Sequence, residues 1–158
     1  MSRNPQSHGR GLALKCKWIK RLYSAEGDLK FEKENYNIIT SAGVSALVQF
    51  LSSANAAATT NTFNYIAVGT DSTTEQTSNT ALGTELSRHT GTVSYNAGGV
   101  LEVVATFAAG SGTGAIVEYG ILNSNSGGDL LNRDTEAVIN EGASDSLVVT
   151  AQITFQPG

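Results

Sequence analysis

The chain has too few cysteine and histidine residues for the devices that usually stabilise small domains. Cys16 is the single cysteine, so no disulfide can form within the chain. His8 and His89 are the two histidines, and together with one thiol they are too few for a four-ligand zinc site. We therefore expect no disulfide, no structural metal and no other cofactor. A chain of 158 residues can bury roughly two thirds of its unfolded surface in one core, so a single domain should fold unaided.

Long apolar segments are missing as well. No apolar run is long enough to cross a bilayer, and the first ten residues, MSRNPQSHGR, lack the apolar centre of a signal peptide. We therefore expect a soluble protein that is made inside the cell and has no membrane partner.

Proline and charged residues are scarce, whereas small polar residues are abundant. Only 2 residues are Pro and 15% are charged, but the chain has 17 Thr, 16 Ser, 17 Gly and 12 Asn. This composition is typical of strands and turns. Because 40% of the residues are hydrophobic, it does not indicate disorder.

The charge is distributed unevenly along the chain. Residues 1–33 hold eight Lys and Arg against three Asp and Glu, a balance of +5, whereas residues 34–158 have a balance of −9. We interpret the basic segment as a binding surface for an acidic partner, such as the acidic body of a neighbouring copy. Nucleic acid is disfavoured as the partner, because the basic residues alternate with apolar ones that a strand needs for packing.

The N-terminal third of the chain divides into three segments. Residues 1–11 have no periodicity and read as an extended arm. Residues 12–39 alternate apolar and basic positions on both sides of the turn around Gly27, which predicts a long β-hairpin. Residues 40–53 follow with a helix that Thr40 or Ser41 caps. Its expected apolar stripe consists of Val44, Leu47, Val48 and Leu51.

The remaining chain is predicted to be β-structure, with one helical turn within residues 80–86. Alternation and glycine-rich turns predict further strands at 63–69, directly after Leu86, at 92–95, 100–107, 115–122 and 147–155. The expected fold is mainly β: a single-domain antiparallel β-sandwich or distorted barrel of about eight strands over residues 12–158, with one short helix and the N-terminal arm.

Motifs for phosphate binding or nucleophilic catalysis are weak. The segment Gly110 to Gly114, GSGTG, precedes a strand rather than a helix, so we interpret it as a hairpin turn and not a phosphate loop. Ser87, His89 and Glu85 share one face of a strand, but no nucleophile elbow or oxyanion loop accompanies them. We therefore predict that the protein is not an enzyme.

Carboxylate groups give weak signals for metal or glycosidase sites. Asp71 and Glu75 share a polar loop, but the regular spacing of a calcium loop is missing. Glu85, Glu102 and Glu118 lie on separate strands whose separation the sequence does not determine. Solvated strand faces are the better explanation for these acids.

Three phrases occur in a characteristic order: NIITSAG before the helix, then YIAVGT with TALGTELSR, then VEYGILN with LLNR. In this order they resemble small structural proteins of tailed bacteriophages, over about residues 37–155. They are similar also to the attachment module of phage tail-collar fibre proteins. The resemblance implies a β-rich virion module without catalytic residues or cofactors.

The resemblance implies a role in assembly. The chain ends directly after its last expected strand, so we expect no fibre shaft, which favours a capsid decoration or cement protein. A tail, neck or fibre-attachment adaptor is the alternative, and a carbohydrate-binding module using Trp18 or Tyr95 is less favoured because aromatic residues make up only 7%.

We expect the protein to reside in the virion, to form a trimer or another symmetric homo-oligomer, and to contact the major capsid protein or a tail or neck protein. Arg88 and Arg133 are nearly the only cations of the acidic body. They are alternative contact residues, and internal ion pairs are an equal explanation for them. The candidate partner-binding residues are Arg3, Arg10, Lys15, Lys17, Trp18, Lys20 and Arg21.

Overall fold

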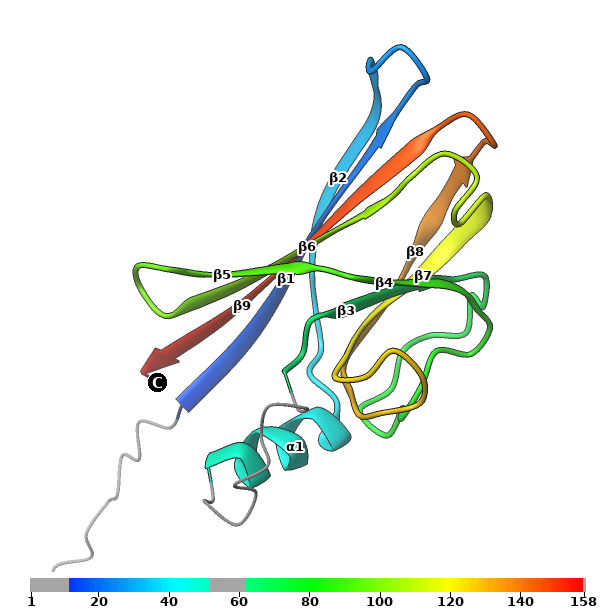
Figure 1. Ribbon diagram of the computed structural model, residues 1–158. Helices are drawn as coiled ribbons and strands as arrows, with labels where there is room; N and C mark the ends of the chain where they lie inside the picture. Colours follow the sequence, from blue (N-terminus) through cyan, green and yellow to red (C-terminus); the bar gives the residue numbers. More distant parts are fainter. Residues whose placement is uncertain (1–11, 52–61, 158) are drawn as a thin grey trace, which may run out of the picture.

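The computed structural model describes residues 12–51 and 62–157, and within them the chain forms nine strands and one helix. The strands make two antiparallel sheets that pack face to face as a sandwich (Figure 1). The expected sandwich is therefore confirmed, whereas the arm at 1–11 and the helix end at 52–53 lie outside the described residues.

Sheet A contains five strands in the order β2-β1-β9-β6-β5, and sheet B contains four in the order β4-β3-β7-β8. The strands of sheet A are β1 (Leu12–Tyr23), β2 (Leu29–Asn37), β5 (Thr92–Asn96), β6 (Val100–Phe107) and β9 (Ser146–Pro157). Those of sheet B are β3 (Tyr65–Gly69), β4 (Glu85–Thr90), β7 (Gly114–Leu122) and β8 (Leu130–Glu141).

The N-terminal hairpin forms as its alternation predicts. β1 and β2 pair antiparallel, with Gly27 at φ 88° in the turn, a conformation that favours glycine. β1 also pairs with β9 along its whole length, so the first and last strands lie side by side in the middle of sheet A.

Four connections between described strands pass from one sheet to the other, namely β2 to β3, β4 to β5, β6 to β7 and β8 to β9, and two of them are made at glycines. Gly91 joins β4 to β5, and a Cβ atom there would lie 2.6 Å from Cγ1 of Val103, so only glycine allows the strand to cross at this point. The glycine-rich segment 110–114 was expected to be a hairpin turn, and this is wrong. It joins β6 of sheet A to β7 of sheet B, because both strands already have other partners within their own sheets.

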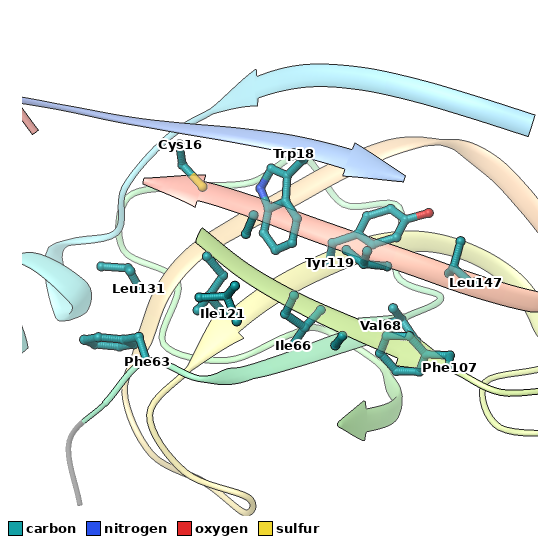
Figure 2. Packing of buried hydrophobic residues seen from close by; sticks show 14 of the residues in the cluster. Cys16, Trp18, Phe63, Ile66, Val68, Phe107, Tyr119, Ile121, Leu131 and Leu147 are labelled. Atoms are coloured by element: carbon teal, nitrogen blue, oxygen red, sulfur yellow. The ribbon is translucent and has the colours of Figure 1, made fainter. Parts of the chain in front are cut away.

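The core lies between the sheets (Figure 2). Alternate residues of β1, β6, β7 and β9 fill it, as expected for strands with one buried face. Its largest apolar side chains include Trp18, Phe107, Tyr119, Ile121 and Leu147, all fully buried.

Helix α1 (Ser41–Leu51) packs against β8, and the expected apolar stripe is confirmed at Leu47, which packs against the core, but not at Val44 and Val48. Thr40 caps it, since its Oγ1 accepts a hydrogen bond from the backbone N of Gly43 at 3.0 Å. Gly43 and Ala46 are buried, whereas Val44 and Val48 are exposed. The close approach of the helix to Leu131 explains the difference, because only small residues fit there. The helical turn expected within residues 80–86 does not form. Residues 80–84 are a loop that leads into β4.

Candidate functional site

A cluster of polar side chains lies between the sheets, where edge strand β2 faces edge strand β8. We call it the inner charge cluster; its members are Lys20, Asn35, Asn37, Asp134 and Glu136. The side chains of Lys20 and Asp134 are 0% and 1% exposed and form an ion pair. Nζ of Lys20 lies 3.5 Å from Oε1 of Glu136 and donates to Oδ1 of Asn35 at 2.7 Å.

Asp134 receives further hydrogen bonds from the amides of β2. Its Oδ1 accepts from Nδ2 of Asn35 at 2.8 Å and from Nδ2 of Asn37. Glu136 also pairs with Lys33, which is partly exposed at the rim of the cluster. The cluster therefore combines a buried amine, a buried carboxylate with two amide donors on one oxygen, and a second carboxylate.

Aromatic rings enclose Lys20 on the core side. Its Nζ lies 4.4 Å from the ring centroid of Tyr119 and 5.9 Å from that of Trp18. Nε1 of Trp18 donates to Oδ1 of Asn132 at 2.6 Å, which orients the indole. These contacts separate the amine from solvent and hold it by cation–π attraction.

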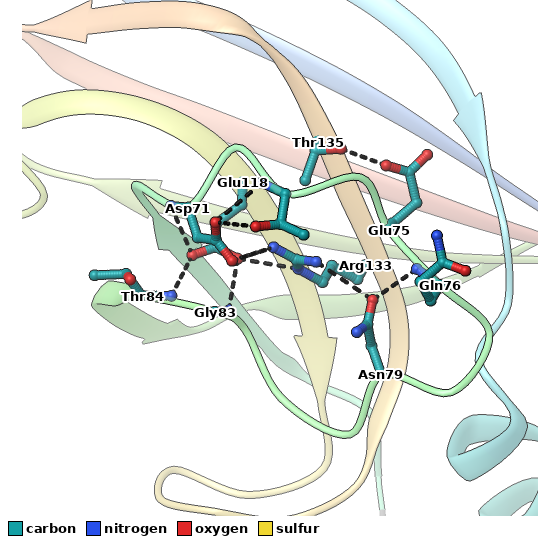
Figure 3. A network of polar contacts seen from close by, with 10 residues as sticks. Asp71, Glu75, Gln76, Asn79, Gly83, Thr84, Glu118, Arg133 and Thr135 are labelled. Atoms are coloured by element: carbon teal, nitrogen blue, oxygen red, sulfur yellow. Dashed lines mark hydrogen bonds and ion pairs between the residues drawn. The ribbon is translucent and has the colours of Figure 1, made fainter.

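A second cluster lies on the face of sheet B that is turned away from sheet A (Figure 3). We call it the Arg133 clamp; its members are Asp71, Asn79, Glu118 and Arg133. The guanidinium of Arg133 lies 2.9 Å from Glu118 and 3.1 Å from Asp71. The hydroxyl and backbone amide of Thr73, and then Arg133, hold the pKa of Asp71 below its usual value.

Glu118 fastens the loop between β3 and β4. Its carboxylate accepts hydrogen bonds from the backbone amides of Gly83 at 2.9 Å, Thr84 at 2.7 Å and Asp71 at 3.1 Å. The carboxylate of Glu118 and the guanidinium of Arg133 are thus engaged within the chain, and their contacts hold the loop on the sheet.

A third group of polar residues lies where β6 crosses to β7. Nε2 of His89 lies 2.6 Å from Oγ of Ser111, and the imidazole packs against Phe107. Glu141 is 3% exposed, and neither of its carboxylate oxygens has a partner among the described residues. Burial, and then the charge of Asp145, raises the pKa of Glu141 to about 7.

The predicted partner-binding residues have different surroundings. Trp18 and Lys20 are fully buried and engaged inside the sandwich, so neither is accessible to a partner in this fold. Lys17 pairs with Glu34, and Arg21 pairs with Glu32, on the exposed face of sheet A. Lys15 is exposed. Arg3 and Arg10 lie outside the described residues.

The charge complementarity that was expected between copies is present within one chain. Lys20, Lys30 and Lys33 of the basic hairpin pair with Asp134, Asp145 and Glu136 of the acidic body. Arg88 likewise binds Glu85 and the backbone oxygens of Ser124 and Gly127. Internal pairing thus accounts for both Arg88 and Arg133.

Glu85, Ser87 and His89 do not come together as a catalytic set. Glu85 binds Arg88 instead of His89, and the imidazole binds Ser111 rather than Ser87. A bulge opposite Val68 and Gly69 turns Glu85 away from the face expected from simple alternation.

The carboxylates that could serve calcium binding or sugar cleavage also form other contacts. Glu75 accepts a hydrogen bond from Thr135, and Glu102 accepts one from Gln152 at 2.7 Å. Residues 12–51 and 62–157 contain no group of three or more His, Cys, Asp or Glu side chains suited to hold a metal ion.

Accessible features of the described residues include a sheet edge and a surface pocket. The pocket, about 420 Å³ in volume, lies where β2 ends beside β1 and is lined by residues including Lys15, Tyr36 and Thr154. Edge strand β5 is exposed along its whole length, and the side chains of Val93 and Tyr95 are 44% and 77% exposed. The edge of β5 is thus exposed to solvent, whereas Lys20 and Asp134 of the inner charge cluster are not.

Sequence reasoning missed the inner charge cluster, because β8 was not predicted as a strand. Asn132, Asp134 and Glu136 occupy alternate positions that face inward, where the pattern would ordinarily require apolar residues. The signal available was the absence of glycine and proline over residues 129–141, which gives no reason to assign this segment to a loop.

Comparison with family models, curated proteins and solved structures found no match. The described part of the chain has no helix long and apolar enough to cross a membrane.

Proposed function

We propose that this chain is a non-enzymatic structural protein of a tailed-phage virion, a capsid decoration or cement protein that acts as a homo-oligomer. The observation that carries the proposal is the unprotected edge of sheet A at β5. An exposed strand edge has unpaired backbone donors and acceptors, which makes it a template for pairing with another chain.

The other edges of the sandwich carry features that discourage such pairing. β2 contains four charged residues, and β4 contains Glu85 and Arg88. β8 contains charged residues and pairs with β7 through two register shifts. β5, with the sequence TVSYN, has no charge, no proline and no register shift. Among the described edge strands it is the one best suited to contact another copy.

Two further observations support a structural role. Glu85, His89 and Glu118 make internal contacts with Arg88, Ser111 and Arg133, which is compatible with a structural role. The ordered phrases on which the phage resemblance rests fall in the start of α1 and in β3, β4, β7 and β8, which form one continuous part of the fold.

The test is the copy number of the chain in particles purified from its source, measured by quantitative mass spectrometry against the major shell protein. A decoration role predicts a copy number comparable to that of the shell subunits. A few copies per particle would instead support the tail, neck or fibre-attachment role. Absence from particles would contradict the proposal.

A further inference from the structure

Lys20 and Asp134 bring an amine and a carboxylate together in a site closed to water. Their side chains are 0% and 1% exposed and belong to different sheets. Keeping two ions in such a site costs desolvation, whereas an amide that joins them carries no charge. We propose that Nζ of Lys20 and Cγ of Asp134 condense into an intramolecular isopeptide bond that links β1 of sheet A to β8 of sheet B.

The neighbouring carboxylate is arranged to move protons for this reaction. Oε1 of Glu136 lies 3.5 Å from Nζ of Lys20, and the carboxylate also pairs with Lys33. Lysine amines are established protein nucleophiles once they lose their charge. Glu136 is therefore the base of the proposed step.

The amides of β2 are arranged to stabilise the charge that develops during attack. Nδ2 of Asn35 and Nδ2 of Asn37 both donate to Oδ1 of Asp134. When Nζ adds to Cγ, negative charge accumulates on that oxygen, and two donors already in place lower the barrier. Oδ2, which contacts Nζ, is left as the departing oxygen.

The rings of Tyr119 and Trp18 hold Nζ of Lys20 in a fixed position and exclude water from it. They lie 4.4 Å and 5.9 Å from Nζ. Holding an amine against a carboxyl group converts a bimolecular condensation into an intramolecular one with a large effective concentration.

The atoms of the step balance without an oxidant or other co-reactant. The Lys20 ammonium passes one proton to Oδ2 of Asp134, and the amine nitrogen then forms a bond to Cγ. Glu136 takes a second proton from the nitrogen and delivers it to Oδ2. The bond between Cγ and Oδ2 breaks, one water leaves, and Glu136 returns to its starting state.

The first measurement is peptide mapping of the folded wild-type protein by mass spectrometry. We expect a branched peptide that joins the segment containing Lys20 to the segment containing Asp134, lighter than the two separate peptides by one water. Two separate unmodified peptides would overturn the proposal. A loss of water confined to the Asp134 peptide would also overturn it, because that indicates cyclisation of the aspartate with its own backbone.

Substitution of the electrophile gives a second, independent test. Asp134→Asn should form the same amide with loss of ammonia, so the cross-linked variant and the cross-linked wild type should have equal masses. Lys20→Met lacks the amine and should keep the mass of its sequence, whereas the control Lys17→Met should still cross-link. A Lys20→Met variant that loses the same water would contradict the assignment.

The role of Glu136 is tested by rate. Glu136→Gln should slow cross-linking by roughly a hundredfold, the usual contribution of a positioned base, when chains isolated unfolded and not yet cross-linked are allowed to fold. The matched control is Glu34→Gln, which removes an acid from the exposed face of β2. An equal effect of both variants would remove Glu136 from the mechanism. The peptide map of the wild-type protein needs no variant, so a variant that fails to fold leaves this main test intact. The presence or absence of the isopeptide bond also does not depend on the proposed virion role.

Discussion

Glu141 illustrates how a single carboxylate can make the stability of this fold depend on pH. It lies inside the sandwich without a hydrogen-bond partner among the described residues, and burial raises its pKa from 4.5 to about 7. A folded-state pKa above the unfolded value means that the native state holds the proton more tightly. The resulting stabilisation is present below pH 4.5 and is lost as the pH rises through 7.

We predict that Glu141→Gln raises the free energy of unfolding at pH 8 by about 2–3 kcal/mol and changes it little at pH 4. Gln keeps the size of the side chain but cannot ionise, so the loss at high pH disappears. Urea unfolding at both pH values measures the difference. The control is Glu102→Gln, at a carboxylate bonded to Gln152 on the exposed face of sheet A. An equal gain at pH 4 and pH 8 would show that ionisation is not the cause.

Arg133 shows the opposite arrangement, in which a buried charge is fully compensated. It is 2% exposed, and its guanidinium contacts Glu118, Asp71 and Asn79. Glu118 in turn accepts three backbone hydrogen bonds from the loop between β3 and β4. Burying these ions therefore positions a loop of small polar residues that has little apolar area of its own.

At the scale of elements, Gly43 determines how closely α1 approaches sheet B. A Cβ atom at this position would lie 2.5 Å from Cα of Leu131 and 2.7 Å from its carbonyl oxygen. Both atoms belong to the backbone of β8, which cannot move without disturbing the strand. The helix therefore docks through its smallest residues and leaves Val44 and Val48 exposed.

We predict that Gly43→Ala lowers the free energy of unfolding by about 1–3 kcal/mol, although alanine has the higher helix propensity. The clash with β8 outweighs the gain in propensity. Chemical denaturation measures the loss. Ser45→Ala, at an exposed position of the same helix, should change stability by no more than about 0.5 kcal/mol. A Gly43→Ala variant as stable as the wild type would mean that the helix is not docked this closely.

At the scale of the whole molecule, the ion pairs of the basic hairpin stay within the domain, whereas the uncharged edge of β5 is open to another copy. Three lysines of the basic hairpin pair with carboxylates of β8 or of the loop that follows it. Assembly is therefore expected to depend more on backbone pairing and on Val93 and Tyr95 than on long-range charge attraction.

We predict that the wild-type chain sediments as an oligomer of its 16.5 kDa subunit and that Ser94→Lys shifts it to the monomer. A lysine in the middle of β5 places a charge on the pairing edge, the device by which natural edge strands avoid association. Analytical ultracentrifugation measures the change. Ser72→Lys introduces the same charge in an exposed loop and should leave the oligomer intact. A monomeric wild type would contradict assembly through this edge.

The sequence by itself determined those parts of the local structure whose signals lie between neighbours along the chain. Alternating residues predicted β1, β6 and β9, a glycine at Gly27 predicted the first hairpin, and Thr40 predicted the start of the helix, because each depends on neighbours along the chain. Burial of polar residues and the choice of sheet depend instead on distant partners. Only the tertiary structure therefore revealed that β6 and β7 belong to different sheets, and that α1 docks through Gly43. Asp134 can face inward because Lys20 and two amides from the other sheet compensate its charge, and these partners are distant in the sequence.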